Sequence, residues 1–218
     1  MIEAAFGLAK QESVTDIPGL ARSYGPWSGV RSNHVINNRG SFTGVDGSSR
    51  SITTEDDKAL MIALRSAADL VIVDAATARK ERYKSPSSLA NLAIFSRSGD
   101  FDQIPAVADA ATKTFLFTPE PDTAPIGVNL TTVRISDDPF AGFSDWSSKV
   151  GFCSMLLEAG PTLTAMAFAS GLVSESALTL VPAQKHLEPS SLNHPFDLNA
   201  KLVSIAHSLD ASFTLWKH

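Results

Sequence analysis

The sequence predicts an α/β protein in which helices cover both faces of a mixed, mostly parallel sheet and the chain closes with an antiparallel hairpin. Two observations lead to this three-layer α/β/α sandwich. Short segments such as 69–73, which is continuously apolar after Asp69, are typical of parallel strands buried between helical layers. The segment 152–163 also runs from an apolar strand through Ala159-Gly160 into a helix with Pro161 at its first position, where proline is favoured.

Composition limits the possible functions. A chain of 218 residues with 44% hydrophobic and 19% charged residues is typical of one soluble globular domain. The net charge of -5 argues against general nucleic-acid binding, which needs an excess of Lys and Arg. The first residues lack a basic segment followed by a long apolar stretch, and no apolar run is long enough to cross a membrane. We therefore expect a cytoplasmic protein with neither nucleic acid nor membrane as partner.

The lone cysteine, Cys153, cannot form an internal disulfide framework or a zinc site by itself. It falls within an apolar segment, so we expect a small, buried hydrophobic side chain. His186 and His194 have no metal-ligand spacing to Cys153 or to a carboxylate cluster. No metal site is predicted.

Residues 1–30 are predicted to form an N-terminal arm that packs on the domain 31–218 or on a partner subunit. Pro18-Gly19 and Tyr24-Gly25-Pro26 are turn signals, and only a short helix, Ile2 to Lys10, is possible before them. No linker composition separates two folding units, so the whole chain is expected to be one domain.

Val30 to Asn37 reads as the first core strand, and its buried amides, Asn33 and Asn37, need hydrogen-bond partners. Those partners are either neighbouring backbone groups or a ligand. The segment 38–52 is rich in Gly and Ser and carries Arg39 and Arg50. It is either a loop that folds over a ligand or an ordinary exposed serine loop.

A helix is predicted from Thr54 to Ala68, because Thr54-Glu55-Asp56-Asp57 resembles a capping box and an apolar face follows at helical spacing. Arg65 lies in its last turn, where a cation complements the helix dipole. The strand 69–73 then leads to the turn Asp74-Ala75-Ala76-Thr77. Glu81, among basic neighbours, reads locally as a solvated helix residue.

Four further strands and two helices complete the expected order. Ser96-Arg97-Ser98-Gly99 directly follows one of these strands; a hydroxyl and a guanidinium there suit a phosphate, although a plain Ser/Gly turn is the alternative. The closing hairpin has Asp210 in its turn. The strands are Leu92–Phe95, Lys113–Thr118, Gly127–Ile135 and Ser174–Val181, the helices Pro139–Lys149 and Pro161 to about Gly171, and the hairpin Leu202–His207 with Phe213–Lys217.

The turn before Pro161 has the geometry of an anion site. The first N–H groups of a helix have no partner within the helix and favour negative charge, and Gly160 permits close approach to the backbone. An ordinary strand-to-helix connection explains the same residues equally well.

Glu158-Ala159-Gly160-Pro161 resembles the Glu-Gly-Gly-Pro segment of the riboflavin-biosynthesis pyrimidine reductases. Segment 33–49, Leu64-Arg65 and Thr77 follow the order of that family's strand, glycine-rich loop, helix end and Gly-x-x-Thr turn. The resemblance extends from about residue 24 to the C-terminus. It implies a dihydrofolate-reductase-like fold, NADPH as cofactor, a phosphorylated ribosylamino-pyrimidine or similar small molecule as substrate, and a homodimer.

The resemblance also implies individual roles. Glu81 is the candidate catalytic residue, beside the nicotinamide. The implied substrate contacts are Asn33, Ser49, Arg65 and Glu158. The implied cofactor contacts are Ile36, Ser51, Thr77, Glu81, Ser96 and Arg97, together with Gly160, Pro161, Thr162, Leu163, Thr164 and Ala165 at the pyrophosphate.

Three positions depart from the family pattern. Arg39 replaces an aspartate, Asp74 stands where the family has glycine, and Ala159 replaces the first glycine of the pair. A carboxylate at Asp74 repels a pyrophosphate unless it turns away, and Ala159 is tolerated only at negative φ. Two alternatives to the riboflavin-pathway reductase therefore remain: a non-catalytic relative that serves as a binding or dimerisation module, and a reductase of the same fold with another small imine or carbonyl substrate.

Overall fold

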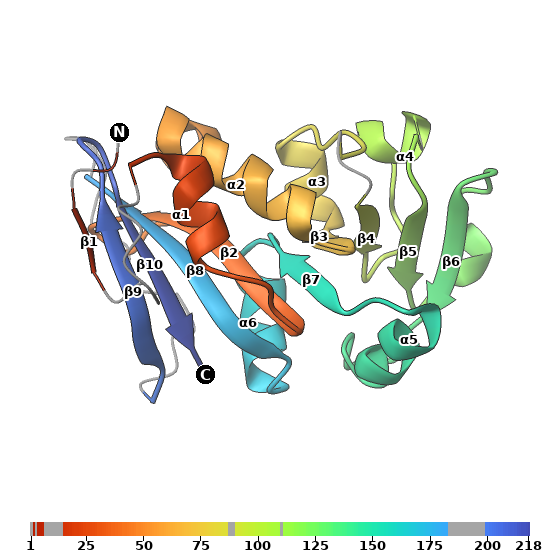
Figure 1. The fold of residues 1–218 in the computed structure, drawn as a ribbon. Coiled ribbons are helices and arrows are strands. Elements are labelled where there is room, and N and C mark those ends of the chain that lie inside the picture. Colours follow the sequence, from red (N-terminus) through yellow and green to blue (C-terminus); the bar gives the residue numbers. More distant parts are fainter. Residues whose placement is uncertain (1, 3, 7–14, 87–89, 110, 183–198) are drawn as a thin grey trace.

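The computed structural model describes residues 2, 4–6, 15–86, 90–109, 111–182 and 199–218, which form one ten-stranded sheet with helices on both faces (Figure 1). The strand order is β1-β9-β10-β8-β2-β7-β3-β4-β5-β6. The strands are β1 Ala4–Phe6, β2 Gly29–Asn37, β3 Leu70–Asp74, β4 Asn91–Phe95, β5 Thr114–Thr118, β6 Leu130–Arg134, β7 Ser154–Leu157, β8 Val173–Val181, β9 Lys201–His207 and β10 Ser212–Lys217.

The sheet is parallel from β8 through β6 and antiparallel at its other end. All neighbouring pairs from β8-β2 to β5-β6 run parallel, whereas β10 pairs antiparallel with both β8 and β9. The hairpin register joins Ser212 to His207, with Asp210 in the connecting turn. The mixed sheet with a C-terminal antiparallel hairpin is confirmed.

Helices form the two outer layers. Figure 1 shows α2, α3 and α4 on one face and α5 and α6 on the other. Three apolar core clusters join these helices to the sheet. One contains side chains of α1 and α2, and another contains side chains of α3 and α4. The third contains Phe143 from α5 and Leu163 and Ala167 from α6. The helices are α1 Ile17–Ser23, α2 Glu55–Ala67, α3 Ala75–Lys80, α4 Pro105–Asp109, α5 Phe143–Val150 and α6 Pro161–Ala169, with short 3-10 turns at Ser49–Ser51 and Pro121–Thr123.

Local signals fix most helix ends. The Thr54 hydroxyl accepts the Asp57 N–H at 3.1 Å, so the predicted cap of α2 is confirmed. The predicted helix Pro139–Lys149 begins later, at Phe143, after Gly142. Gly142 and Gly151 flank α5 with φ of 73° and 93°, values that glycine adopts without strain.

The N-terminal arm differs from its prediction. The predicted helix Ile2–Lys10 is wrong for Ala4–Phe6. These residues form strand β1, which pairs antiparallel with β9, because sheet pairing outweighs a weak local helix preference. Conversely, the turn signal Pro18-Gly19 lies inside α1. Asp16 accepts the Gly19 N–H at 2.6 Å, and proline is tolerated in the first turn of a helix.

Cys153 is exposed, so its predicted burial is wrong. β7 begins one residue later, at Ser154, and the Asp69 carboxylate holds the N–H groups of Cys153 and Ser154 at 2.9 and 2.8 Å. The segment 184–189 with His186, and His194 beyond it, lie outside the described residues.

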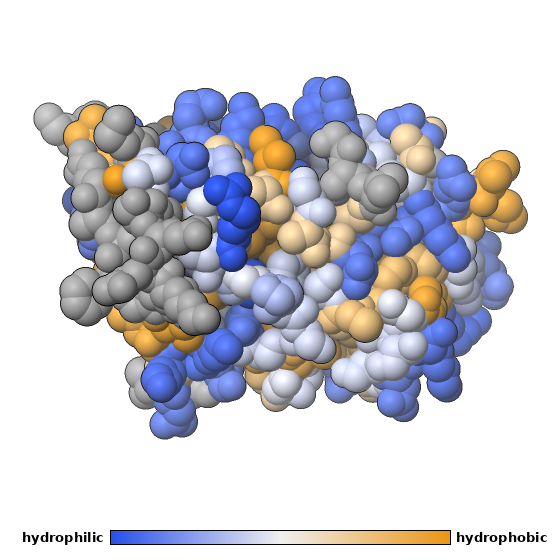
Figure 2. All heavy atoms as spheres, in the orientation of Figure 1, coloured by the Kyte–Doolittle hydropathy of each residue, from blue (hydrophilic) through white to orange (hydrophobic). Residues whose placement is uncertain are grey.

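The parts of the chain that are described contain no helix long and apolar enough to span a membrane. Within the same residues, no three His, Cys, Asp or Glu side chains gather as metal ligands do. Figure 2 shows a mixed polar and apolar face, with apolar atoms at the end of the molecule where the turn before β6 lies. Ile126 and Val128 are fully exposed in this turn, at the amino edge of the parallel strands.

Candidate cofactor and substrate site

A cavity of about 850 Å³ opens at the carboxyl ends of the parallel strands. Segments 74–77, 96–98 and 160–163, which follow β3, β4 and β7, line one side, and segments after β5 and β6 complete it. Ligands of open α/β sheets bind at this edge, and the volume lies within the range of about 300–1,000 Å³ typical of small-molecule sites. This cavity is therefore the candidate functional site.

The cavity brings together predicted cofactor residues that lie far apart in the sequence. They are Thr77, Ser96, Arg97, Gly160, Pro161, Thr162 and Leu163. The other predicted cofactor residues do not line it: Ile36, Ser51, Glu81, Thr164 and Ala165.

The turn after β4 supplies a cation at the cavity. Ser96 is buried, and its hydroxyl donates to the Asp100 carbonyl at 3.1 Å, which fixes the turn. Arg97 is exposed beside it. An exposed guanidinium next to a hydrogen-bonded turn suits recognition of a phosphate.

One carboxylate, that of Asp74, joins the beginnings of α3 and α6. Its Oδ1 accepts the Thr77 N–H at 2.8 Å, and its Oδ2 accepts the Gly160 N–H at 2.6 Å. Gly160 is the N-cap residue of α6 and has no side chain to cap the helix itself. The carboxylate does not turn away from the predicted pyrophosphate position. It accepts the hydrogen bond of the Gly160 N–H group there.

Gly160 is required by close packing within the protein. Its φ of -66° is open to any residue, but a Cβ there would lie 2.7 Å from the Thr77 hydroxyl and 3.2 Å from Asp74 Oδ2. The predicted close approach at Gly160 is thus made by the protein's own side chains. Ala159 has negative φ, because Arg82 and Gln103 are the non-glycine residues with positive φ in the described chain; its methyl group is therefore unstrained.

Behind this turn, the buried side chains of His34 and Thr164 hold the Ala159 carbonyl. His34 Nε2 lies 3.0 Å from that oxygen, and the Thr164 hydroxyl donates to it at 3.0 Å. Burial lowers the pKa of His34, so the ring is neutral, and the carbonyl contact places its proton on Nε2. Thr164 is fully buried and supports the turn from behind. The prediction missed His34, although a histidine within an apolar strand was a visible signal.

Two predicted substrate residues, Arg65 and Glu158, pair with each other. Arg65 Nε lies 3.1 and 3.0 Å from the two Glu158 oxygens, and Nη2 lies 2.6 Å from Oε2. The Tyr83 hydroxyl bonds to both side chains, and the guanidinium stacks 4.7 Å from the centre of the Tyr83 ring. Tyr83 was not among the predicted site residues, because no local pattern distinguishes it.

The side chains of Arg65, Glu158 and Tyr83 shift one another's pKa values. Burial alone would lower the pKa of Arg65, but the Glu158 carboxylate and Tyr83 hold it above its ordinary value. Burial and the Glu158 carboxylate together raise the pKa of the Tyr83 hydroxyl well above its usual range. Arg65 is thus a permanent cation and Tyr83 a permanent hydroxyl donor.

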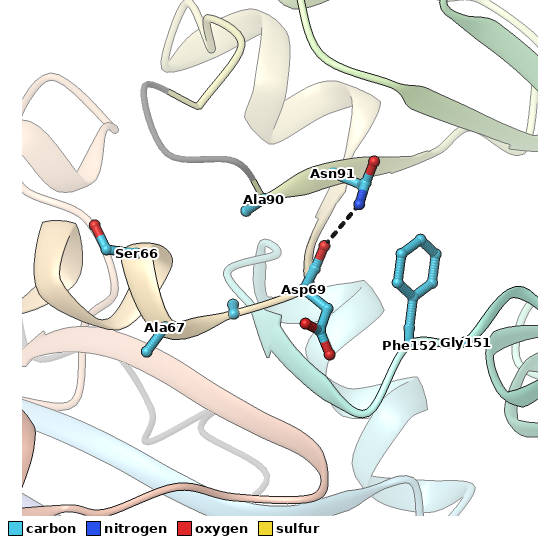
Figure 3. A pocket seen from close by; sticks show the side chains of 8 residues that line it. Ser66, Ala67, Asp69, Ala90, Asn91, Gly151 and Phe152 are labelled. Atoms are coloured by element: carbon cyan, nitrogen blue, oxygen red, sulfur yellow. Dashed lines mark hydrogen bonds between the residues drawn. The ribbon is translucent and has the colours of Figure 1, made fainter.

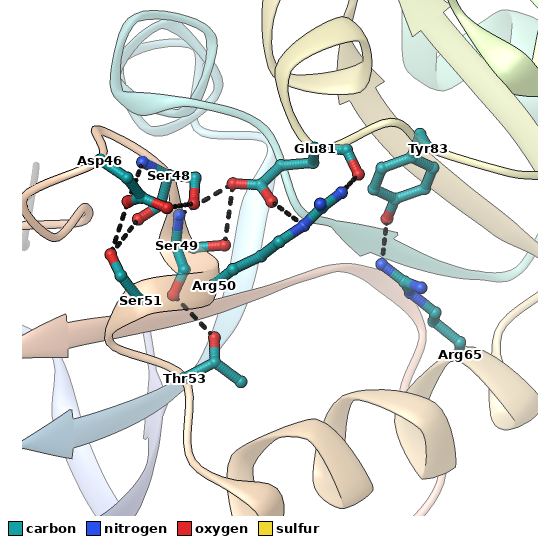
Figure 4. Close-up of polar contacts among 9 residues, drawn as sticks. All are labelled: Asp46, Ser48, Ser49, Arg50, Ser51, Thr53, Arg65, Glu81 and Tyr83. Carbon is teal, nitrogen blue, oxygen red and sulfur yellow. Dashed lines mark hydrogen bonds and ion pairs between the residues drawn. The ribbon is translucent and has the colours of Figure 1, made fainter.

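Glu81 binds the serine loop. Its Oε1 accepts the N–H and hydroxyl of Ser49 at 2.8 and 3.1 Å, and its Oε2 lies 3.1 Å from Arg50 Nε. Figure 4 shows Glu81 between this loop and the neighbouring Arg65–Tyr83 pair. Ser51 Oγ donates to Asp46 at 2.6 Å. Glu81, Ser49, Arg65 and Glu158 are therefore brought to one region at the end of α3.

The predicted contacts on β2 are buried. Asn33 and Ile36 are 9% and 5% exposed, at the part of β2 that extends beyond its pairing with β7. Asn37 uses its Oδ1 to accept the N–H groups of Arg39 and Ser41, both at 3.0 Å. For Asn37, the backbone alternative is correct.

Asp57, in the first turn of α2, is a buried carboxyl group on which the Glu158 charge acts. Burial raises the pKa of Asp57 to about 6, a shift that the nearby Thr179 and Thr53 hydroxyls reduce and the Glu158 charge increases. The sequence alone predicts only a helix-dipole role for this residue.

A smaller cavity of about 370 Å³ lies at the opposite edge, at the amino ends of β3, β4 and β7 (Figure 3). Its polar groups are used to join strands. Asn91 Nδ2 donates to the Asp69 carbonyl at 3.1 Å, and the Asp69 carboxylate holds the start of β7. None of the predicted site residues lines it.

Comparison with known proteins supports the fold. No family model and no curated protein matches this chain. A pyrimidine reductase-like protein from Corynebacterium diphtheriae superposes with a TM-score of 0.74 at 20% identity, over 93% of this chain and 98% of the other. A deaminase/5-amino-6-(5-phosphoribosylamino)uracil reductase from Thermotoga maritima gives 0.71 at 15% identity, over 92% and 59%.

This chain therefore spans about 59% of the length of the Thermotoga protein. A dihydrofolate reductase from Enterococcus faecalis, solved with NADP(H), superposes with a TM-score of 0.53 at 8% identity, over 86% of this chain and 95% of the other. Together with the sheet order and the three layers, these likenesses identify the architecture. The chain has the dihydrofolate-reductase-like fold that is shared by structures described as pyrimidine reductases.

Proposed function

We propose that this protein is an NADPH-dependent reductase resembling 5-amino-6-(5-phosphoribosylamino)uracil reductase, which opens a ribose to a ribityl chain. The observation that supports the proposal most is the carboxyl-edge cavity, which gathers Thr77, the turn at Ser96-Arg97 and the start of α6 in one place. Bound NADPH supplies the hydride. The protein's part is to bind and orient cofactor and substrate.

The cavity has a volume suited to a dinucleotide, and polar groups that can bind phosphate lie at Ser96-Arg97 and at the start of α6. In the proposal, Arg97 and the Ser96 turn bind the 2′-phosphate, the start of α6 binds the pyrophosphate and Thr77 lies between them. Ile36 and Ser51 are proposed contacts nearer the nicotinamide. Asp74 is the exception to the fit, since its carboxylate already accepts the Gly160 N–H.

The polar region at the end of α3 is the proposed substrate side. Arg65 is proposed to bind the substrate phosphate, with Glu158, Ser49 and Asn33 as further contacts, and Glu81 is the candidate catalytic group. For Arg65 to bind a phosphate, it must exchange part of its pairing with Glu158. Its side chain is 22% exposed, which leaves it accessible.

A calorimetric or fluorescence titration with NADPH, with NADH as control, tests the proposal. We expect micromolar binding that prefers NADPH, and loss of that preference in Arg97→Ala. Hydride transfer is then followed with the phosphoribosylamino-pyrimidine. Absence of binding at about 1 mM NADPH, equivalent to about 4 kcal/mol, would refute a reductase that uses this cofactor.

The non-catalytic relative is the second candidate. It is favoured by two internal pairings: Asp74 with the Gly160 N–H, and Glu158 with Arg65. A binding module with these features binds neither NADPH nor the pyrimidine. If NADPH binds but the pyrimidine ribotide is inert, the reductase acts on another imine or carbonyl. The homodimer and the cytoplasmic location remain predictions.

A further inference from the structure

Asp74 differs from the other helix caps of this protein. Asp16 and the Thr54 hydroxyl each cap only the helix that follows them, through one backbone N–H. Asp74 caps α3 through Thr77 and, with its second oxygen, reaches the N-cap residue of α6, which is 86 residues later in the chain. Both carboxylate oxygens are thus used, at a wall of the carboxyl-edge cavity.

The position of this carboxylate sets what can bind beside it. A phosphate approaching Gly160 meets an N–H that already donates at 2.6 Å and a fixed negative charge on the acceptor. The Thr77 hydroxyl and Asp74 Oδ2 also occupy the space next to the Gly160 Cα. Repulsion between like charges and the loss of one donor both oppose a phosphate here.

We propose that Asp74 limits the affinity of this site for a dinucleotide, because its carboxylate competes with the pyrophosphate for the start of α6. This inference rests on the proposed function, because the ligand is the nicotinamide dinucleotide. It predicts that the carboxylate weakens binding of the pyrophosphate and leaves the adenosine 2′-phosphate end, at Ser96-Arg97, unaffected. Removing the charge while retaining the cap should therefore increase the affinity for NADPH.

Asp74→Asn is the main test, because Asn caps a helix about as well as Asp and lacks the charge. Asp74→Ser is a second uncharged cap, in case the first variant folds poorly. Asp16→Asn is the matched control, because it makes the same change at the cap of α1. Among the described residues, the Asp16 carboxylate accepts one hydrogen bond, from the Gly19 N–H at 2.6 Å. Calorimetry measures binding of NADPH and of adenosine 2′-phosphate, which has no pyrophosphate, to each protein.

We expect Asp74→Asn to bind NADPH about tenfold more tightly than the wild type, with a smaller gain at high salt, where charge repulsion is screened. Adenosine 2′-phosphate should bind both proteins equally, and Asp16→Asn should match the wild type with both ligands. Equal or weaker NADPH binding by both Asp74 variants, with normal binding of adenosine 2′-phosphate, overturns the inference but not the proposed cofactor. If neither ligand binds any of the proteins, both proposals are wrong.

Discussion

The protein contains two Arg–Glu pairs of similar chemistry at opposite ends of the sheet strands. Arg31 lies 2.9 and 2.5 Å from Glu175 through two nitrogens and stacks 4.1 Å from the Trp27 ring. Arg65 pairs with Glu158 through the corresponding two nitrogens, but contacts both carboxylate oxygens, and it stacks on Tyr83. The Arg31 side chain has no exposed surface, whereas that of Arg65 is 22% exposed.

The surroundings of the two pairs decide their roles. Arg31 also donates to the carbonyls of Tyr24 and Gly25, so it ties the N-terminal arm to β2 and β8 near their amino ends. Burial lowers the pKa of Arg31, although Glu175 opposes this shift. Arg65 instead lies at the carboxyl edge, beside the serine loop. An Arg–Glu pair therefore does not by itself predict a functional site; position in the sheet and access to solvent distinguish the candidate pair, Arg65–Glu158, from the buried pair at the arm.

The largest expected effect is on stability at the arm. Glu175→Gln leaves the Arg31 guanidinium buried without its counter-charge, and we expect the free energy of unfolding to fall by about 3–5 kcal/mol in chemical denaturation. Lys217→Ala is the control. Lys217 contacts Glu175 at 3.5 Å but is 59% exposed, so its loss should cost at most about 1 kcal/mol. Folded Glu175→Gln should still bind NADPH as the wild type does.

Glu158→Gln should affect activity more than stability. Because water can reach Arg65, we expect a smaller loss of stability than in Glu175→Gln, about 2 kcal/mol, together with loss of substrate reduction. Denaturation curves and a reductase assay on the same preparations measure both effects. The distinction between the two pairs fails if Glu158→Gln is the less stable variant or retains full activity.

Asp57 extends the comparison to a carboxyl group surrounded by hydroxyls and by the Glu158 charge. Its pKa is raised from 3.8 to about 6, so the folded state holds the proton more tightly. The resulting stabilisation is complete below the unfolded pKa and is lost as the pH rises through the folded pKa. Asp57→Asn lacks this pH dependence. Its free energy of unfolding relative to that of the wild type should therefore rise by about 2 kcal/mol as the pH increases from 4 to 7. A pH-independent difference in unfolding free energy would contradict this pKa.

The smallest expected effect is that of Tyr83→Phe. The ring still stacks on Arg65, while the hydroxyl that bonds to both Arg65 and Glu158 is lost, and we expect about 1 kcal/mol less stability. Tyr24→Phe is the matched control near Arg31, because Arg31 contacts the Tyr24 backbone carbonyl and, at 5.9 Å from its centre, the Tyr24 ring, and Phe retains both. If Tyr83 positions Arg65 for a substrate phosphate, KM rises in Tyr83→Phe with little change in NADPH affinity. An unchanged KM would limit Tyr83 to packing.

The sequence by itself determined the elements whose signals are local. A few neighbouring residues are enough to predict each of these elements. They are the Thr54 cap of α2, the apolar segments of β3, β4 and β7, and the start of α6 at Pro161. The family resemblance assigned Ser96, Arg97 and Gly160 to one cofactor, and they line one cavity because the carboxyl ends of parallel strands meet at one edge.

The tertiary structure alone decided what depends on distant partners. β1 is a strand because β9 is available to pair with it, and Cys153 is exposed because Asp69 fixes where β7 begins. Likewise, no local pattern shows that Asp74 accepts an N–H from Gly160 or that Arg65 faces Glu158 and Tyr83. Periodicity and capping report neighbours in the chain, whereas charge pairing and burial depend on which strands fold side by side.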